Sequence, residues 1–214
     1  MRKLSVLLSA FVVALTASAY ADLALPGELT PDILDKAMEI NGETYHVVRT
    51  ISKNSLSLKV IDNKANEIWS FNEMGEQAAK FKLNGEADSL KIEDLDGDNI
   101  PEIIAGCTIT PNTALYVFKY DMNNKNFKPM TFGYEGMPDA GRDFMVSDIF
   151  AENGENIVFE RKDLIKTMGK IFGDNGAVPG FYFFKLQNGE YICNKQVPIK
   201  VIPVTEEDSK EETK

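Results

Sequence analysis

The chain has 214 residues, with 33 acidic and 23 basic side chains and a formal net charge of −10 at pH 7. Hydrophobic residues make up 43% of it, which is typical of a globular protein with a buried core. A strongly acidic surface repels phosphate backbones, so the composition excludes nucleic acid as an expected partner and favours cations.

The N-terminus has the layout of a secretory signal peptide. Arg2 and Lys3 precede an apolar run at 4–15, and Ala19-Tyr20-Ala21 offers a cleavage site after the second alanine. The apolar run is shorter than the roughly 20 residues that cross a membrane, and no later segment is apolar enough to be a span. We therefore expect residues 1–21 to be removed and the protein to be secreted or periplasmic.

The segment at 22–43 carries helix signals. Thr30-Pro31-Asp32 combines an N-cap residue, a first-turn proline and an early acid, and Asn41-Gly42 is a suitable stop. The sequence therefore predicts an extended lead-in and then a short helix from Pro31 to about Ile40.

The following part of the chain has a β composition. Runs of branched and aromatic residues alternate with Asn, Asp and Gly, which predicts a mostly β domain over 44–204. Asp62-Asn63, Asn123-Asn124 and Asn188-Gly189 predict hairpin turns. The expected strands lie at 45–52, 56–62, 67–71, 79–83, 89–93, 101–107, 115–120, 127–132, 145–149, 156–161, 181–187 and 190–201.

Three segments carry no strand signal. We expect one helical turn at 163–169 and a surface loop at 173–180, which contains three glycines and a proline. The charged tail at 205–214 is expected to be disordered, because it has too few apolar residues to pack.

The acidic loop (residues 94–102, DLDGDNIPE) has the strongest functional pattern. Carboxylates fall at its first, third, fifth and ninth positions, and Asn99 tolerates the left-handed backbone that such loops need. Calcium takes six to eight oxygen ligands, and its charge would offset the repulsion between crowded carboxylates. The predicted calcium ligands are the side chains of Asp94, Asp96, Asp98 and Glu102 and the main-chain carbonyl of Ile100.

The acidic loop has two other interpretations. An EF-hand needs an acid at position 12, where this chain has Ala105, and it needs flanking helices rather than the strands expected here. An open, solvated acidic turn without metal is the alternative that the sequence leaves standing.

Residues 89–107, SLKIEDLDGDNIPEIIAGC, resemble the calcium loop and flanking strands of FG-GAP repeats, the β-propeller blades of integrin alpha chains and of bacterial VCBS repeat proteins. The resemblance is specific over this segment and extends loosely over 78–132. It implies antiparallel blade-like sheets, and because three blades at most can be counted, a truncated or small propeller-like fold.

A weak internal repeat supports this resemblance. Residues 93–104 can be laid over 147–158 without a gap. The second copy has Phe150 in place of a ligand and Asn156 at the ninth position, so we expect it not to bind metal. The alternative is that two β hairpins look alike by chance.

Enzymatic patterns are sparse. His46 is the only histidine and fits a structural role in a strand, so no catalytic residue is predicted. A hydrolase that uses a carboxylate pair stays open, because acids are plentiful. Pairing of Cys107 with Cys193 also stays open. The strand aromatics fit a core better than a sugar-stacking platform; they are Trp69, Phe71, Tyr116, Phe118, Tyr182 and Phe184.

The sequence thus predicts an exported, non-enzymatic calcium-binding module. Calcium is expected to stabilise a β domain that binds a protein or glycan partner. The alternatives are a secreted or periplasmic hydrolase and a structural envelope protein in which calcium only stabilises the fold.

Overall fold

The computed structural model describes residues 32–53, 55–173 and 176–199. The predicted signal peptide and the charged tail lie outside these ranges. Inside them every regular element is a β-strand, which confirms the mostly β fold, and no helix is long and apolar enough to cross a membrane.

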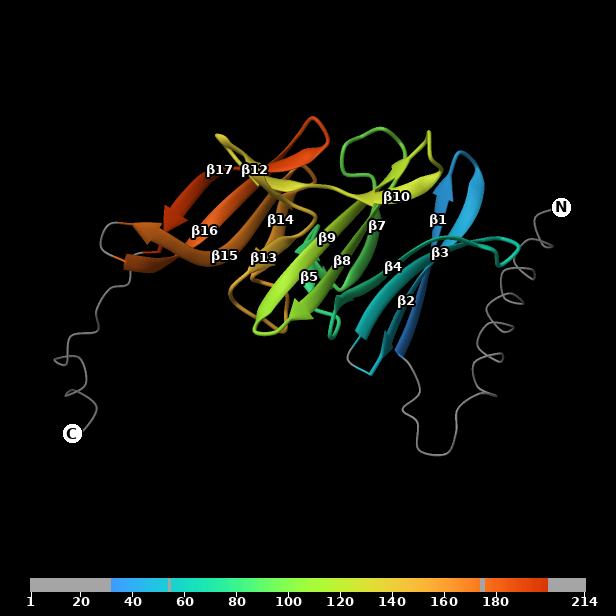
Figure 1. The fold of residues 1–214 in the computed structure, drawn as a ribbon, viewed down its shortest axis with the longest axis horizontal. Coiled ribbons are helices and arrows are strands. Elements are labelled where there is room, and N and C mark those ends of the chain that lie inside the picture. The colour runs from blue at the N-terminus through green and yellow to red at the C-terminus, as the bar shows by residue number, and fades with distance from the viewer. Residues whose placement is uncertain (1–31, 54, 174–175, 200–214) are drawn as a thin grey trace.

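The strands form three sheets that follow one another along the long axis of the molecule (Figure 1). The first is an antiparallel meander of four strands in chain order. Its strands are β1 (Asp32–Ile40), β2 (Glu43–Ser52), β3 (Ser55–Asp62) and β4 (Glu67–Gly75).

The second sheet lies in the middle and has the order β10-β9-β8-β7, with β13 paired to β9. All of its pairings are antiparallel. Its strands are β7 (Leu90–Glu93), β8 (Glu102–Ile109), β9 (Asn112–Asp121), β10 (Asn126–Pro129) and β13 (Met145–Ser147).

The third sheet has eight strands in the order β12-β11-β17-β16-β15-β14-β5-β6. It is mixed, because β11 pairs with β17 and β14 pairs with β5 in parallel. Its strands are β5 (Phe81–Leu83), β6 (Glu86–Asp88), β11 (Phe132–Tyr134), β12 (Met137–Arg142), β14 (Ile157–Arg161), β15 (Leu164–Gly173), β16 (Gly176–Gln187) and β17 (Glu190–Pro198).

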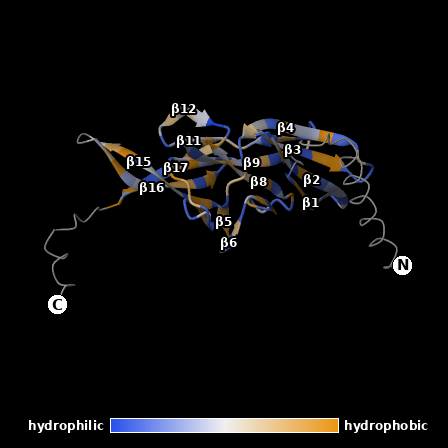
Figure 2. Cartoon of the chain, turned by 90° about the horizontal axis from the view of Figure 1, so that it is seen from below, coloured by the Kyte–Doolittle hydropathy of each residue, from blue (hydrophilic) through white to orange (hydrophobic). Residues whose placement is uncertain are grey.

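The middle sheet is buried on both faces, because successive side chains of a strand point to opposite sides. On β8, Ile103 belongs to the core cluster shared with the first sheet, whereas Ile104 belongs to the cluster shared with the third sheet. On β9, Phe118 and Val117 divide in the same way. Hydrophobic residues concentrate on the strands and hydrophilic ones in the turns (Figure 2). The continuous apolar runs of β8 and β9 are thus the consequence of two-sided burial.

The predicted N-terminal helix is wrong, because residues 32–40 form β1. Its inward side chains Leu34, Met38 and Ile40 recur every second residue or a multiple of it, which is strand periodicity. Asn41-Gly42 makes the β1–β2 turn with φ of 52° and 79°. The same dipeptide that ends a helix is a strong hairpin signal, and here the hairpin forms.

The predicted helical turn at 163–169 is also wrong, because these residues begin the β15–β16 hairpin. The predicted loop at 173–180 belongs largely to the same hairpin, since Gly173 pairs with Gly176. Pairing with the neighbouring strands therefore overrides the weak local signals there.

Both cysteines are buried and free. Cys107 packs in the cluster between the first and second sheets, and Cys193 packs in the cluster between the second and third. Each thiol therefore acts as a small core side chain.

Candidate metal centre

The acidic loop connects β7 to β8, two neighbouring strands of the middle sheet. Their pairing brings Glu93 and Glu102 opposite each other at the base of the loop. Gly97 and Asn99 have φ of 81° and 66°, the left-handed conformation that glycine and asparagine tolerate best. The loop therefore reverses direction within a few residues.

The aspartates fold the loop by accepting hydrogen bonds from its own main chain. The two carboxylate oxygens of Asp94 accept from the N–H groups of Gly97 at 2.8 Å and Asn99 at 3.1 Å. Asp96 accepts from Asp98 N–H at 3.2 Å. Asp98 in turn accepts from Ile100 N–H at 2.8 Å. These bonds place three carboxylates on a single tight turn.

Glu102 is the buried member of the site, with a relative exposure of 0%. Its Oε2 accepts from Leu95 N–H at 2.8 Å, but its Oε1 has no hydrogen-bond partner among the described residues. Burial raises the pKa of Glu102 to about 7, against the Leu95 hydrogen bond, and the charges of Asp96 and Asp98 add to the rise. The surroundings of Glu102 therefore do not fully compensate the negative charge of its ionised form.

Three predicted ligands come together. One carboxylate oxygen each from Asp94, Asp96 and Glu102 lies within 4.8 Å of the other two. Calcium–oxygen bonds are about 2.3–2.6 Å long, so two ligands of one ion lie up to ~5 Å apart. Asp98 lies outside this triad, and the side chain of Ile100 packs against the first core cluster. The triad has the size of a calcium site.

A lysine from the neighbouring strand lies among these carboxylates. Lys119 Nζ donates to Asp96 Oδ2 and, at 2.8 Å, to Asp98 Oδ2, and it is 3.9 Å from Glu102 Oε1. Burial works against the ammonium charge, but the bonds to the two aspartates outweigh it and raise the pKa of Lys119. Burial also opposes ionisation of Asp98, and the hydrogen bond from Lys119 overcomes it and lowers the pKa of Asp98.

A second lysine reaches the outer edge of the loop from the third sheet. Lys162 Nζ donates to the main-chain oxygen of Asp94 at 3.2 Å and pairs with Glu93 at 2.5 Å. Its own carbonyl accepts from the Tyr191 hydroxyl at 3.0 Å. The acidic loop is thus attached to the seam between the second and third sheets.

Sequence analysis missed both lysines. Lys119 follows Phe118, which pairs with Ile103, so it continues the register toward Glu102 on the same face. Only the register of β8 and β9 reveals this proximity, because the two residues are far apart in the chain.

The segment at 148–156, the expected second copy, is built differently. It joins β13 of the second sheet to β14 of the third, so the strand pairing around the acidic loop is not repeated. Asn156 is 1% exposed and donates from Nδ2 to the carbonyl of Ile149 at 2.6 Å. Phe150 is 52% exposed. The acid-rich ligand pattern is absent from this segment.

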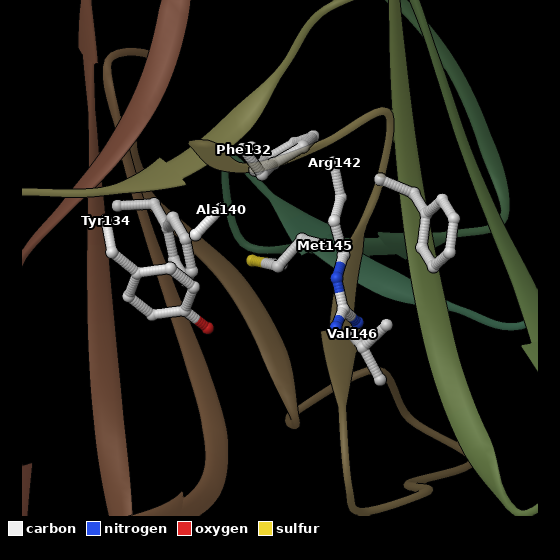
Figure 3. Close-up of a pocket in the computed structure, with 9 residues that line it drawn as sticks. Phe132, Tyr134, Ala140, Arg142, Met145 and Val146 are labelled. Atoms are coloured by element: carbon white, nitrogen blue, oxygen red, sulfur yellow. The ribbon is translucent and has the colours of Figure 1, made fainter. Parts of the chain in front are cut away.

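A groove opens where the second and third sheets meet. Two adjoining hollows of about 350 and 520 Å³ share the side chains of Tyr134, Arg142, Phe144, Val146 and Phe184. Figure 3 shows Tyr134 and Arg142 at one of them, with Met145 between them in that view. Arg142 forms no ion pair with any described side chain.

The groove offers one described carboxylate, Asp148, rather than a pair. Another hollow, of about 320 Å³, contains Glu43 and Asp62. There Asp62 accepts from the side chain and main chain of Asn66 and from Lys64 N–H, and these bonds lower its pKa. A glycosidase acid needs a raised pKa, so these two hollows do not favour the carboxylate-pair hydrolase. A further hollow, of about 490 Å³, does contain two glutamates, Glu135 and Glu190.

Comparison of the chain with family models, with curated proteins and with solved structures finds no match. The resemblance to FG-GAP repeats therefore rests on the acidic loop and its flanking strands alone.

Proposed function

We propose that the protein is an exported, non-enzymatic module that binds one calcium ion in the acidic loop. The observation that carries this proposal is the buried Glu102, which belongs to a carboxylate triad and whose Oε1 lacks a hydrogen-bond partner among the described residues. A divalent cation would supply the missing charge, with Asp94, Asp96 and Glu102 as ligands and Asp98 and the Ile100 carbonyl as further ones. Export fits this role, since extracellular modules bind calcium at about 10⁻⁴ to 10⁻³ M.

The strand arrangement supports a relation to propeller blades. The acidic loop joins two strands of an antiparallel meander, β7-β8-β9-β10, and blades are four-stranded sheets. We propose that this meander is a single blade-like unit. The neighbouring sheets pack on its two faces instead of repeating it around an axis.

Calcium is proposed to stabilise the fold by linkage. At a calcium concentration ten times the Kd, the free energy of unfolding should rise by about 1.4 kcal/mol. Isothermal titration calorimetry of the mature chain should give one site, with magnesium much weaker because it demands a tight octahedron. Asp96→Ala should abolish the heat and the stabilisation, whereas the matched Asp148→Ala should keep both. Absence of calcium heat at 10 mM metal, or a parent response in Asp96→Ala, would refute the proposal.

The partner is proposed to bind in the groove between the second and third sheets. Exposed rings of Tyr134 and Phe172 suit stacking on sugar faces, and Arg142, which has no ion pair with a described side chain, suits a carboxylate, so an acidic glycan fits best. Oligogalacturonate should bind more tightly than a neutral oligosaccharide of equal length. Arg142→Gln should remove this preference, and Arg161→Gln, which breaks a surface pair with Asp163, should not. Equal binding of both sugars would exclude an acidic glycan, and binding of neither would leave a protein as the partner class to test.

A further inference from the structure

We infer that Lys119 is a built-in competitor of calcium, an ammonium group that must leave the acidic loop before a divalent ion binds there. The inference rests on the calcium site proposed above and names the residue that sets its affinity.

The competition follows from shared ligand residues. Lys119 Nζ bonds to Asp96 Oδ2 and lies 3.9 Å from Glu102 Oε1. Both of these residues belong to the triad that would hold the metal. A calcium ion within about 2.6 Å of their oxygens would lie close to the ammonium, and the two cations would repel each other. The lysine and the metal therefore cannot occupy the carboxylates at the same time.

The Lys119 ammonium only partly neutralises the acidic loop, so its replacement by calcium can be favourable. It carries a single charge and satisfies Asp96 and Asp98, but 3.9 Å is beyond hydrogen-bond reach of Glu102 Oε1. A divalent ion has twice the charge and accepts six to eight oxygens, so it can reach all the carboxylates at once. Exchange is favourable once the calcium concentration is high enough to offset the lost lysine contacts.

The exchange needs little rearrangement of the fold. Lys119 lies on β9, which is paired on both sides, while its side chain is 32% exposed on a flexible four-carbon stem. The loop is closed by its own main-chain hydrogen bonds and by Leu95–Glu102. Lys162 contacts Asp94 through the main-chain oxygen and so leaves the carboxylates free. Calcium should consequently change the charge and stability of the loop more than its shape.

The test compares Lys119→Met with a matched control. Methionine keeps the apolar stem and removes the charge. Lys128→Met makes the same charge change directly across the sheet from Lys119, but Lys128 pairs with Asp121 instead of the acidic loop. Calcium titration calorimetry should give a Kd about tenfold lower for Lys119→Met than for the parent, and a Kd within twofold of the parent for Lys128→Met. In chelator, Lys119→Met should melt at a lower temperature than the parent, because its carboxylates have lost their counterion.

The outcomes separate this inference from the proposed function. Equal affinity in the parent and Lys119→Met overturns the role of the lysine and leaves the calcium site standing. Binding by Lys119→Met but not by the parent supports the competition and overturns calcium binding by the natural chain. Binding by the parent but not by a folded Lys119→Met protein overturns the competition alone, and absence of binding in both proteins overturns both ideas. An equal gain in affinity in Lys128→Met would show that the effect comes from the overall charge and would overturn the specific role of Lys119.

Discussion

The segments at 94–102 and 148–156 are closed in the same way, but by an acid in the first and by an amide in the second. In each, the ninth side chain is buried and bonds to the main chain of the second residue. Glu102 accepts from Leu95 N–H at 2.8 Å, whereas Asn156 donates to the Ile149 carbonyl at 2.6 Å. The bond closes the loop in both cases, but only the first places a carboxylate in the interior.

This difference shows what a buried acid demands. A neutral amide carries no charge, so the segment ending at Asn156 closes without a cation even though Asn156 Oδ1 also lacks a hydrogen-bond partner among the described residues. An ionised carboxylate is costly to bury unless a positive charge is near. In the acidic loop that charge is Lys119, whose Nζ lies 3.9 Å from Glu102 Oε1. The ninth side chain, together with Phe150 at the third position, thereby distinguishes the second segment from the candidate metal site.

The largest effect is expected from Asn156→Asp, which gives the second segment the acid of the first. The change removes the donor to Ile149 and buries a charge next to a carbonyl, so the free energy of unfolding should fall by about 2–4 kcal/mol. Calcium should not restore it, because Phe150 supplies no ligand. Urea denaturation with and without calcium measures both effects.

The control is Asn153→Asp in the same segment. Asn153 is exposed and accepts from Glu155 N–H, which an aspartate also does, so its stability should stay within about 0.5 kcal/mol of the parent. A stable Asn156→Asp protein that gains stability from calcium would mean that the segment is a latent metal loop and that the two segments do not differ in metal binding.

A smaller effect is expected from pH. The pKa of Glu102 is raised from 4.5 to about 7 in the folded state, so between these values the folded protein binds more protons than the unfolded chain. In chelator, its contribution should therefore lower stability as pH rises from about 4.5 to about 7, by about 1–3 kcal/mol. Denaturation curves at several pH values, compared with Glu102→Gln to cancel other groups, isolate this contribution.

Calcium should reverse that pH trend. The proposed metal would bind the ionised carboxylate, so protons should compete with it below about pH 7 and its affinity should rise with pH. Glu102→Gln should lose the calcium response at every pH. A parent protein whose difference from Glu102→Gln does not change with pH would contradict the assigned burial of Glu102.

Local sequence predicted most strands and several turns, because branched and aromatic runs between Asn, Asp and Gly carry a direct signal. It failed at 32–40 and 163–169, where short segments of mixed apolar and polar residues suit either a helix or a strand. Pairing decided those cases: β1 forms nine residue pairs with β2, and β15 lies between β14 and β16. Such pairing energy comes from residues outside any local window.

The sequence by itself determined the acidic loop, since the spacing of its acids and the left-handed position at Asn99 are local properties of the chain. It also determined that the second copy lacks the ligand pattern, through Phe150 and Asn156. Only the tertiary structure decided that Glu102 is buried and that Lys119 and Lys162 reach the loop. Burial and cross-strand proximity depend on how three sheets stack, and electrostatic interactions act through space, so residues outside the motif would set the affinity of the proposed site.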